Sequence, residues 1–514
     1  MNGAEALLKT LVEGGIDVCF ANPGTSEMQL VQAIGQTDAM RPVLCLFEGV
    51  VSGAADGYAR MADKPAATLL HLGSGFSNSL ANMHNARRAG SPIVNIVGDH
   101  ASYHLQFDAP LTSDLPAIAR WGSHHTEIAR SPEDLSAAGA RTLQAALRGN
   151  GQIATLIAPA DFAWSEAAEA AAPLPAPERL TVGRQRVERA AEAMRGDGET
   201  CILLGGHALR EHNLAALGAM AEAHDLTLMC ATFPTRLARG EGRVPVQRLP
   251  YFAEQAMEVL APFKRLILLG TAAPVSFFAY PDKESWLTPE HCELIMLAEA
   301  SEDIDGTIAA LLEELALEPT PEHVHEFVRQ DITEDALTPL TIGQIVSNEL
   351  PEQAIVCDEG NTSSLPLFLV TAQARAHDWL TLTGGAIGQG LPLALGASLA
   401  CPDRKVVALE ADGSAMYTIQ ALWSMARENA DVTVVLFNNS SYAILNIELA
   451  RVGAGEGNAR TLSMLDLSNP SMSFASIAEG LGVPATQARS AAEFQTQFRA
   501  AMQEKGPHLI EAIL

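Results

Sequence analysis

Two oxygen-bearing side chains near the C-terminus, Asp412 and Asn439, have the types and the spacing of a magnesium site. Each follows an apolar segment, 405–410 (KVVALE) or 432–437 (VTVVLF), whose composition predicts a buried parallel strand. A right-handed crossover would bring both strand ends to one sheet edge, beside the N-terminus of the helix between them. Carboxylate and amide oxygens suit Mg²⁺, and helix N–H groups bind anions. This edge therefore predicts a site for a metal-bound diphosphate.

The segment that joins these two residues resembles the fingerprint of thiamine-diphosphate enzymes, in which Gly-Asp-Gly is followed by a spacer and Asn-Asn. Here it reads ADGSAMYTIQALWSMARENADVTVVLFNN, with Ala411 in place of the first glycine. An ordinary buried β-α-β unit with an Asn-rich turn is the alternative. The resemblance implies three metal ligands, namely Asp412, Asn439 and the Ser441 carbonyl. It also implies cofactor contacts at Gly413, Ser414 and Tyr442.

A second candidate, Glu48, follows an apolar strand and precedes a helix in VLCLFEGVVSGAADGYAR. The helix dipole alone favours a carboxylate at a helix N-terminus, so Glu48 could be there without a catalytic role. The resemblance implies a catalytic role instead, because the essential glutamate of these enzymes stands ahead of an ADGYAR-like helix. There it shares a proton with the aminopyrimidine of the cofactor, which then acts as the base for the thiazolium ring.

Two polar residues of the first third match substrate contacts of the family. Thr25 lies in the Pro-Gly turn ANPGTSE, where benzoylformate decarboxylase and its relatives offer a hydroxyl to the substrate carboxylate. His71 ends a strand at the distance from Glu48 that is typical of the active-site histidine of the family. The resemblance therefore implies catalytic roles for Thr25 and His71, although a lone histidine is often structural.

The glycines that follow His71 are also compatible with the dinucleotide-binding motif of a nicotinamide dehydrogenase. Gly73 and Gly75 approximate GxGxxG after a strand, and Asp99 ends the next strand as a ribose-binding acid would. Asn78 replaces the third glycine, and Asp99 lies further along than the usual spacing of about 20 residues. The dinucleotide alternative is therefore the weaker one.

Two turns ahead of the metal motif complete the predicted cofactor site. Asn361 and Thr362 lie in DEGNTSS after an apolar strand, and the resemblance implies that they reach the diphosphate; a polar surface loop is the alternative. In TGGAIGQGLPLALGASLA, the resemblance gives Gly385 a carbonyl contact with the pyrimidine amino group. Ile387 corresponds to the bulky wedge that holds the two cofactor rings in a V shape.

Two positions depart from the family pattern. Ala279 stands where benzoylformate decarboxylase has its second catalytic histidine, so we expect slow protonation of the enamine and its capture by an acceptor. Glu448 stands where the family usually places an aromatic residue facing the substrate. Glycine turns at 205–206 and at Gly270 could hold FAD, as in acetolactate synthases and pyruvate oxidase, and the sequence leaves FAD undecided.

Composition limits the remaining classes of function. The apolar runs fall short of the roughly 18 to 20 residues that a membrane span needs, and the N-terminus has no secretory pattern. A net charge of −28 without a basic cluster argues against nucleic acid as a partner. Seven cysteines without metal or disulfide spacing predict reduced core residues, and we expect a cytoplasmic protein.

Two Pro-rich or charged stretches, 164–180 and 315–340, divide the 514 residues into thirds that each alternate strands with helices. We predict an α/β fold of three doubly wound parallel-sheet domains. The resemblance to thiamine-diphosphate decarboxylases implies a pyrimidine-binding domain, a central Rossmann-like domain and a diphosphate- and Mg-binding domain. Their predicted bounds are 1–165, 181–316 and 336–514.

The sequence is thus identified as a member of the thiamine-diphosphate-dependent decarboxylase and carboligase family, resembling benzoylformate decarboxylase and the acetolactate synthase large subunit. The resemblance implies decarboxylation of a 2-oxo acid, after which the enamine is protonated or joined to an aldehyde or keto acceptor. It also implies a homodimer or homotetramer with active sites at the interface. The alternatives are an FAD-containing acetolactate synthase or oxidase and a catalytically silent cofactor-binding subunit.

Overall fold

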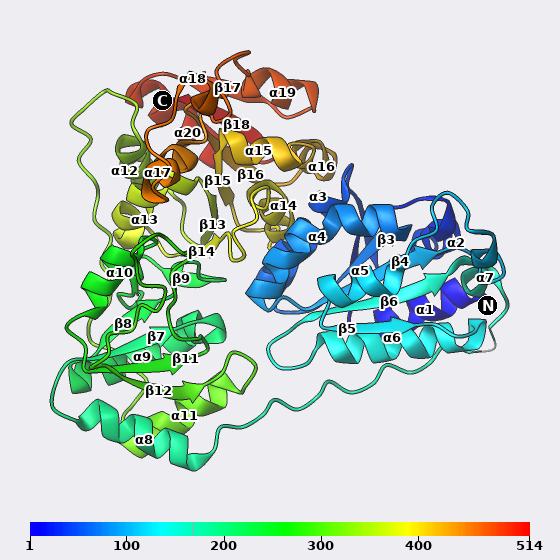
Figure 1. The fold of residues 1–514 in the computed structure, drawn as a ribbon, viewed down its shortest axis with the longest axis horizontal. Helices are drawn as coiled ribbons and strands as arrows, with labels where there is room; N and C mark the ends of the chain where they lie inside the picture. The colour runs from blue at the N-terminus through cyan, green and yellow to red at the C-terminus, as the bar shows by residue number, and fades with distance from the viewer. Residues whose placement is uncertain (168) are drawn as a thin grey trace.

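Three sheets organise the chain, and helices flank each of them (Figure 1). The structure is a computed structural model that describes residues 1–167 and 169–514. Nearly all neighbouring strands are parallel, and buried apolar runs such as VVALEA and VTVVLFN form the central ones, as expected for strands covered on both faces. The predicted α/β fold with doubly wound parallel sheets is confirmed.

The first sheet has six parallel strands. Across the sheet they are β2 (Arg41–Leu44), β1 (Val18–Asn22), β3 (Ala66–His71), β4 (Ile93–Asp99), β6 (Ile153–Pro159) and β5 (His125–Ile128). One face is covered by α1 (Gly3–Glu13), α2 (Met28–Gly35), α6 (Pro132–Ala146) and α7 (Ala160–Trp164). The other face is covered by α3 (Glu48–Ala62), α4 (Leu72–Ala89) and α5 (Leu115–Gly122). The end of β3, at His71, therefore meets the first turns of α3 and α4 at Glu48 and Gly75.

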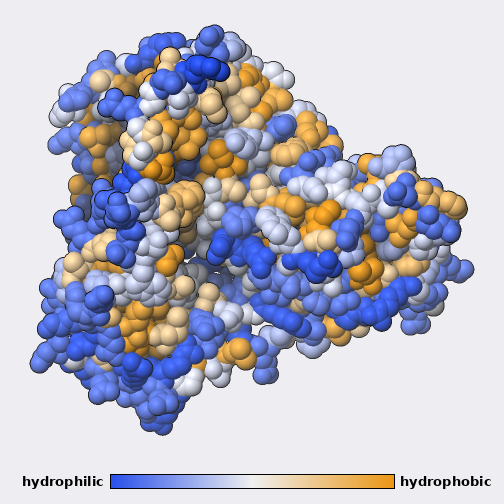
Figure 2. Space-filling model, viewed as in Figure 1, coloured by the Kyte–Doolittle hydropathy of each residue, from blue (hydrophilic) through white to orange (hydrophobic). Residues whose placement is uncertain are grey.

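The central sheet has five strands. In order they are β10 (Gln247–Arg248), β8 (Thr227–Cys230), β7 (Thr200–Leu204), β11 (Arg265–Leu269) and β12 (Glu293–Ala298). The helices α8 (Arg184–Arg195), α9 (Glu211–His224) and α11 (Ile304–Leu315) pack on one face, and α10 (Ala253–Leu260) packs on the other. This domain forms the lower left lobe of Figure 1, and Figure 2 shows a hydrophilic rim around it.

The third sheet has seven strands, one of which comes from the central part of the chain. In order they are β17 (Ala485–Ala488), β18 (His508–Ile513), β16 (Val432–Asn438), β15 (Val406–Ala411), β13 (Ala354–Glu359), β14 (His377–Thr381) and β9 (Leu237–Arg239). β9 pairs antiparallel with β14 and completes the sheet edge. α12 (Pro339–Glu349), α13 (Leu365–Val370) and α20 (Ala491–Gln503) cover one face, whereas α14 (Gly390–Ala400), α16 (Ala421–Glu428) and α19 (Phe474–Gly480) cover the other.

Helices α3 and α14 join the first domain to the third by a close crossing. A Cβ atom at Gly57 would lie 2.0 Å from the carbonyl oxygen of Leu393, and one at Gly396 would lie 1.9 Å from that of Ala54. Glycine at these positions therefore lets the two helix backbones touch, and the apolar core continues across the crossing. In the described part of the chain, no helix has both the length and the apolar character needed to cross a bilayer.

Candidate active site

Asp412 and Asn439 lie together at one edge of the third sheet. Asp412 begins α15 (Asp412–Thr418), and Asn439 follows β16, which pairs in parallel with β15. The buried carboxylate of Asp412 accepts N–H groups from Gly413 at 2.7 Å, Asn439 at 3.1 Å and Ser440 at 2.7 Å. Burial raises the pKa of this carboxyl despite the three donors. A cation beside Asp412 would favour its ionised form.

The turn after Asn439 folds back over the start of α15. Oδ1 of Asn439 accepts the backbone N–H of Ser441 at 3.0 Å. The ring of Tyr442 lies against Gly413, where an added Cβ would be 2.4 Å from Cε1 of the ring. A side chain at Gly413 would displace Tyr442, so the glycine is required for this close approach.

A second turn, after β13, reaches the same edge. Asn361 begins the 3₁₀ turn Asn361–Ser363 with a φ of 50° and donates from Nδ2 to Oγ of Ser414 at 2.9 Å. Thr362 follows it and is half-buried. Because β13 and β15 are neighbours, Asn361, Thr362 and Ser414 flank the start of α15. These side chains offer hydroxyl and amide groups to a ligand bound there.

The donor set at this edge fits Mg²⁺ bound to a diphosphate. The described residues hold no group of three His, Cys, Asp or Glu side chains arranged around a metal. A cation here would draw on the carboxylate of Asp412, an amide, a backbone carbonyl and ligand oxygens, which is the mixture that Mg²⁺ takes beside phosphates. The residues present therefore suit the metal and the diphosphate together.

The glycine turn that carries Gly385 and Ile387 is fixed from two sides. The side chain of Asn85, on α4, accepts a backbone N–H of this turn at 3.1 Å and donates to a backbone carbonyl at 2.7 Å. On the other side, the N–H of Gly388 donates to Oε1 of Glu359 at 2.7 Å. Gly385 has a φ of 75°, which a side chain would strain. Half-buried Ile387 lies between these two anchors.

Asn82 connects this turn to the helix that begins with Glu48. Its Nδ2 atom donates to the carbonyl of Gly49 at 2.8 Å and to the carbonyl of Gly388 at 3.0 Å. The first turn of α3 and the glycine turn ahead of α14 therefore share one donor group. The structure brings Glu48, Gly385 and Ile387 to the same junction of the first and third domains.

Glu48 is the first residue of α3 and is 8% exposed. Oε2 of Glu48 accepts from Nδ2 of Asn78 at 3.0 Å, and a Cβ at Gly75 would lie 3.1 Å from Oε1. Gly73 and Gly75 lie inside α4, not in a turn that could receive a pyrophosphate. The helix thus uses its glycine to make room for Glu48, which contradicts the dinucleotide reading of this segment.

His71, at the end of β3, is held by a buried acid that the sequence analysis missed. Nδ1 of His71 lies 2.8 Å from Oε2 of Glu27, and Gly24 donates its N–H to the same oxygen at 2.7 Å. Burial raises the pKa of Glu27, whose other oxygen has no hydrogen-bond partner. Thr25 is exposed on the same turn. The acid that ends ANPGTSE was the available signal for this contact.

Two buried glutamates below the glycine turn were also missed. Glu359 and Glu410 are register partners on β13 and β15 and are 2% and 0% exposed. Burial raises the pKa of Glu359 to about 7. Burial and the neighbouring charge of Glu359 also raise the pKa of Glu410 well above its ordinary range. We expect this pair to hold at least one proton at neutral pH, because two adjacent buried carboxylates repel each other.

The central-domain segment that contains Ala279 reaches the glycine turn. A Cβ at Gly385 would lie 2.5 Å from Cζ of Phe277, so the Phe277 ring covers Gly385. Burial and a hydrogen bond to Glu448 raise the pKa of Tyr280, in the same segment. Glu448 lies on α17 (Ala443–Arg451) and has one buried oxygen without a partner. Tyr280 and Glu448 therefore form one wall beside Phe277, a residue that no motif predicted, and Ala279 lies exposed between Phe277 and Tyr280 along the chain.

The glycine turns of the central domain touch each other. Gly205 donates its N–H to the carbonyl of Leu269 at 3.0 Å, and a Cβ at Gly205 would lie 2.5 Å from the carbonyl oxygen of Gly270. These turns follow β7 and β11, between which the strand order reverses. Dinucleotides bind at such a reversal point in open α/β sheets. Here backbone occupies the space between the two turns.

The first and third α/β domains, which carry Glu48 and Asp412, define a class of enzyme that uses thiamine diphosphate. Residues 1–124 match the description "thiamine pyrophosphate enzyme, N-terminal TPP binding domain", and residues 362–512 match "thiamine pyrophosphate enzyme, C-terminal TPP binding domain". A Mycobacterium tuberculosis protein, IlvX, provisionally named an acetolactate synthase large subunit, is 50% identical over 100% of this chain and 99% of its own. The chain belongs to the thiamine pyrophosphate enzyme family.

Two more distant relatives are named as decarboxylases. Benzoylformate decarboxylase of Pseudomonas aeruginosa is 28% identical over 97% of this chain and 96% of its own length. The solved structure of a thiamine diphosphate-dependent 4-hydroxybenzoylformate decarboxylase of Rhodococcus jostii has a TM-score of 0.86 and 24% identity, covering 99% of this chain and 98% of that one. The family predicted from the sequence is confirmed: the protein is a thiamine-diphosphate-dependent enzyme related to decarboxylases and acetolactate synthases.

Proposed function

We propose that the protein decarboxylates a small 2-oxo acid with bound thiamine diphosphate and Mg²⁺, and passes the remaining acyl carbon to a proton or to an aldehyde or keto acceptor. The observation that carries this proposal is the pair of hydrogen bonds from Asn82 to Gly49 and Gly388. They hold the start of the Glu48 helix against the glycine turn. The bonds fix the Glu48 helix and the glycine turn, two segments that would supply pyrimidine contacts to the proposed active sites at the interface between copies.

In the proposed site, different residues hold different parts of the cofactor. The carbonyl of Gly385 would accept from the pyrimidine amino group, and Ile387 would support the two rings from below. The other proposed contacts are, for the metal, Asp412, Asn439 and the Ser441 carbonyl and, for the diphosphate, Asn361, Thr362, Gly413, Ser414 and Tyr442. The buried position of Asp412 and the cover of Tyr442 over Gly413 support this assignment.

Thiamine diphosphate, when bound, supplies a nucleophilic ring carbon that stabilises the negative charge left by decarboxylation. Glu48 would hold a proton against a pyrimidine nitrogen, with Asn78 fixing the other side of its carboxylate. His71 and Thr25 would orient the carboxylate of the substrate. The contact from Glu27 to Nδ1 fixes the ring of His71 and leaves Nε2 free for the substrate.

Bond formation to a second carbonyl compound is the outcome that we favour over protonation. The methyl group of Ala279 cannot deliver a proton, and Phe277 adds an apolar ring to the same segment. Slow proton delivery gives an aldehyde or keto acceptor time to bind. Acetolactate-type condensation therefore fits this segment better than simple decarboxylation.

We include no flavin in the proposed reaction. The turns at Gly205 and Gly270 contact each other at the reversal point of the central sheet, where dinucleotides bind in open α/β sheets, so the sequence question of FAD stays open. The visible absorption spectrum of the purified protein tests this point. A flavin spectrum that persists through gel filtration would instead support an FAD-containing acetolactate synthase or oxidase.

We infer a homo-oligomer, dimer or tetramer, in which a second copy completes each active site. Large apolar side chains are exposed on the loop after β4, where Tyr103 is 61% and Phe107 is 68% exposed. Exposed apolar surface of this kind is typical of an interface. Light scattering combined with activity over a dilution series tests the inference, because a monomer should be inactive.

The partners that we propose are small molecules in a reducing, cytoplasmic environment. The chain has a net charge of −28, which disfavours contact with nucleic acid. All seven cysteines are free thiols, and five of them are buried. Free core thiols are typical of proteins that do not meet an oxidising compartment.

The test combines one substitution with a product analysis. The wild-type protein is incubated with thiamine diphosphate, Mg²⁺ and either pyruvate or benzoylformate, and the products are resolved by NMR. Glu48→Gln should abolish turnover at saturating cofactor, whereas the control Glu334→Gln, at an exposed position, should not. Unchanged turnover in Glu48→Gln would refute its role. Bound cofactor without turnover of any 2-oxo acid would favour a silent subunit.

A further inference from the structure

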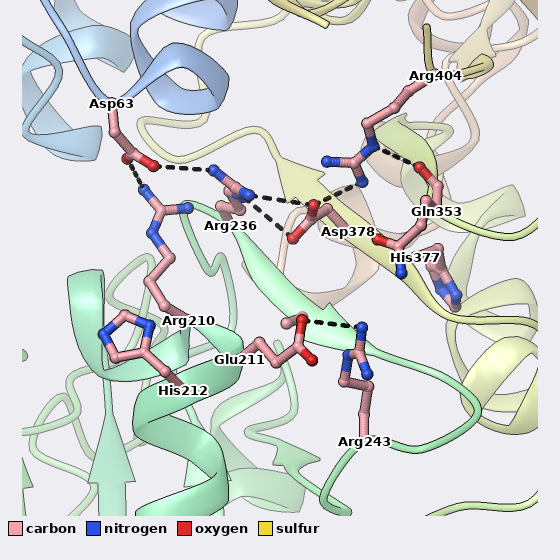
Figure 3. Close-up of a pocket in the computed structure, with 11 residues that line it drawn as sticks. Asp63, Arg210, Glu211, His212, Arg236, Arg243, Gln353, His377, Asp378 and Arg404 are labelled. Carbon is pink, nitrogen blue, oxygen red and sulfur yellow. Dashed lines mark hydrogen bonds and ion pairs between the residues drawn. The ribbon is translucent and has the colours of Figure 1, made fainter.

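A cavity of about 210 Å³ lies where the three domains meet (Figure 3). Asp63 comes from the end of α3, Arg210 from the start of α9, and Asp378 from the start of β14. Residues just before β13 and β15 also line it, whereas the proposed cofactor contacts follow the opposite ends of those strands. We call this cavity the three-domain pocket. It is separate from the proposed active site.

The three-domain pocket carries more positive than negative charge. Four arginines line it against three carboxylates. Asp63 is shared by Arg210 at 2.6 Å and Arg236 at 3.2 Å. Asp378 is shared in turn by Arg236 at 3.0 Å and Arg404 at 2.7 Å. One positive charge is left over, in a chain whose net charge is −28.

Arg210 has a donor that no protein atom uses. Its side chain is 13% exposed and reaches Asp63 through Nη2, but Nη1 is buried without a hydrogen-bond partner. Burial, together with the positive charge of Arg236, lowers the pKa of Arg210 to about 10. A guanidinium only donates, so a buried and unused N–H of Arg210 calls for an acceptor from outside the chain.

Two further groups add to the positive potential. The side chain of Arg243 faces the pocket and is 14% exposed. Its ion-pair partner is the carboxylate of Glu211, which lies 2.9 Å away on a side chain that is 61% exposed. The N-terminus of α9, where Arg210 and Glu211 lie, has no capping side chain. Uncapped helix N–H groups favour an anion. The charges and the dipole therefore act in the same direction.

We propose that the three-domain pocket binds a small, doubly charged oxyanion of the phosphate type, either free or as the end group of a phosphorylated metabolite. Arginine pairs bind such groups through short charge-assisted hydrogen bonds. A volume of about 210 Å³ equals several water molecules at about 30 Å³ each, which suits a phosphate group and little more. The ligand would link the central domain to both others and stabilise their arrangement. This inference does not depend on the proposed catalytic activity.

Titration calorimetry on the full-length protein tests the proposal. Inorganic phosphate and glycerol 3-phosphate are titrated in separate runs at constant ionic strength, with chloride as the reference anion. Saturable binding of phosphate is expected, and Arg210→Gln should weaken it by about tenfold or more, because a charged hydrogen bond contributes about 1.5 to 3 kcal/mol. Tighter binding of glycerol 3-phosphate would identify a metabolite as the ligand, and equal binding would identify free phosphate.

Two further variants keep the test independent of folding. Arg243→Gln loses a partner that is mostly exposed, so it should fold normally and still weaken binding. Arg184→Gln, at a side chain that is 84% exposed on the central domain, should bind as the wild type does. No saturable heat for either anion in the wild type, or equal constants in the wild type, Arg210→Gln and Arg243→Gln, would overturn the proposal.

Discussion

Nδ1 of His71 lies 2.8 Å from a carboxylate oxygen of Glu27, a side chain that is 0% exposed. The acid comes from the turn that carries Thr25, and the imidazole comes from the end of the neighbouring strand. A Cβ at Gly24 would lie 2.3 Å from the same nitrogen, so the turn packs directly on the ring. His71 is therefore positioned by a group that cannot itself reach solvent.

Glu27→Gln is expected to lower kcat/KM for the 2-oxo acid by about ten- to a hundredfold, because a hydrogen bond to a charged group contributes about 1.5 to 3 kcal/mol. Cofactor affinity should stay unchanged, since Glu27 is assigned no cofactor contact. Steady-state kinetics and cofactor titration of the same preparation measure both quantities. Equal kcat/KM in Glu27→Gln and the wild type would remove Glu27 from the site.

Glu359 predicts a pH dependence of stability. Burial raises the pKa of its carboxyl from 4.5 to about 7. The folded protein therefore keeps a proton that the unfolded chain releases near pH 4.5, so stability falls as pH rises from about 5 to about 7. The loss amounts to about 3 kcal/mol. The charged groups that face Glu359 are Glu410 and Asp358, and both are acidic. Neither reverses the direction in which stability changes with pH.

Glu359→Gln should flatten that dependence, because an amide does not titrate in this range. Thermal unfolding of the cofactor-free protein at a series of pH values compares the two slopes. The slope, and not the absolute stability, is the readout, since the amide also changes the bonds to Gly388 and Gly390. Parallel curves for the variant and the wild type would contradict the assignment.

Asn82→Ala is expected to destabilise the protein by about 2 to 4 kcal/mol, because two buried carbonyl groups lose their shared donor. It should also weaken the binding of thiamine diphosphate, since the glycine turn would no longer be held against α3. Asn82→Asp keeps the size but not the donors, and should behave like the alanine variant. Full cofactor affinity in both variants would refute the link between the bridge and the site.

Gly396→Ala is expected to destabilise by about 1 to 3 kcal/mol or more, because its Cβ would lie 1.9 Å from the carbonyl oxygen of Ala54. Gly35→Ala is a matched control at a helix position where nothing lies within 4 Å, and it should be neutral or slightly stabilising. Denaturant unfolding followed by circular dichroism measures both. Equal effects of the two substitutions would show that α3 and α14 tolerate separation.

Local patterns predicted those parts of the site that follow directly from strand ends. Asp412 and Asn439 meet because β15 and β16 are adjacent and parallel, and apolar runs of strand length indicate such pairs. The helix between them was less predictable. It divides into α15 and α16 around residues 419–420, where Thr418 turns its hydroxyl to the carbonyl of Gly388 at 3.0 Å. A single helical period gives no sign of that break.

Contacts between distant segments were not predictable from local patterns. Glu410 lies in an apolar run that reads as any buried strand, and only the register opposite Glu359 makes it unusual. Phe277 reaches Gly385 from another domain, across more than a hundred residues. Such contacts depend on how the domains pack, and a one-dimensional period carries no information on that packing.

The antiparallel strand β9 has a consequence for any shortened form of this protein. It pairs Leu237 with Trp379 and covers the outer edge of β14 with backbone from residues far upstream. A fragment that begins at residue 336 would lack this cover and would present free N–H and C=O groups along the edge strand β14, which carries the large apolar side chains of Trp379 and Leu380. Such edges recruit strands from other chains, so the excised C-terminal domain should self-associate into aggregates. By pairing with β14, the strand β9 thus prevents copies of the chain from associating edge to edge through this sheet.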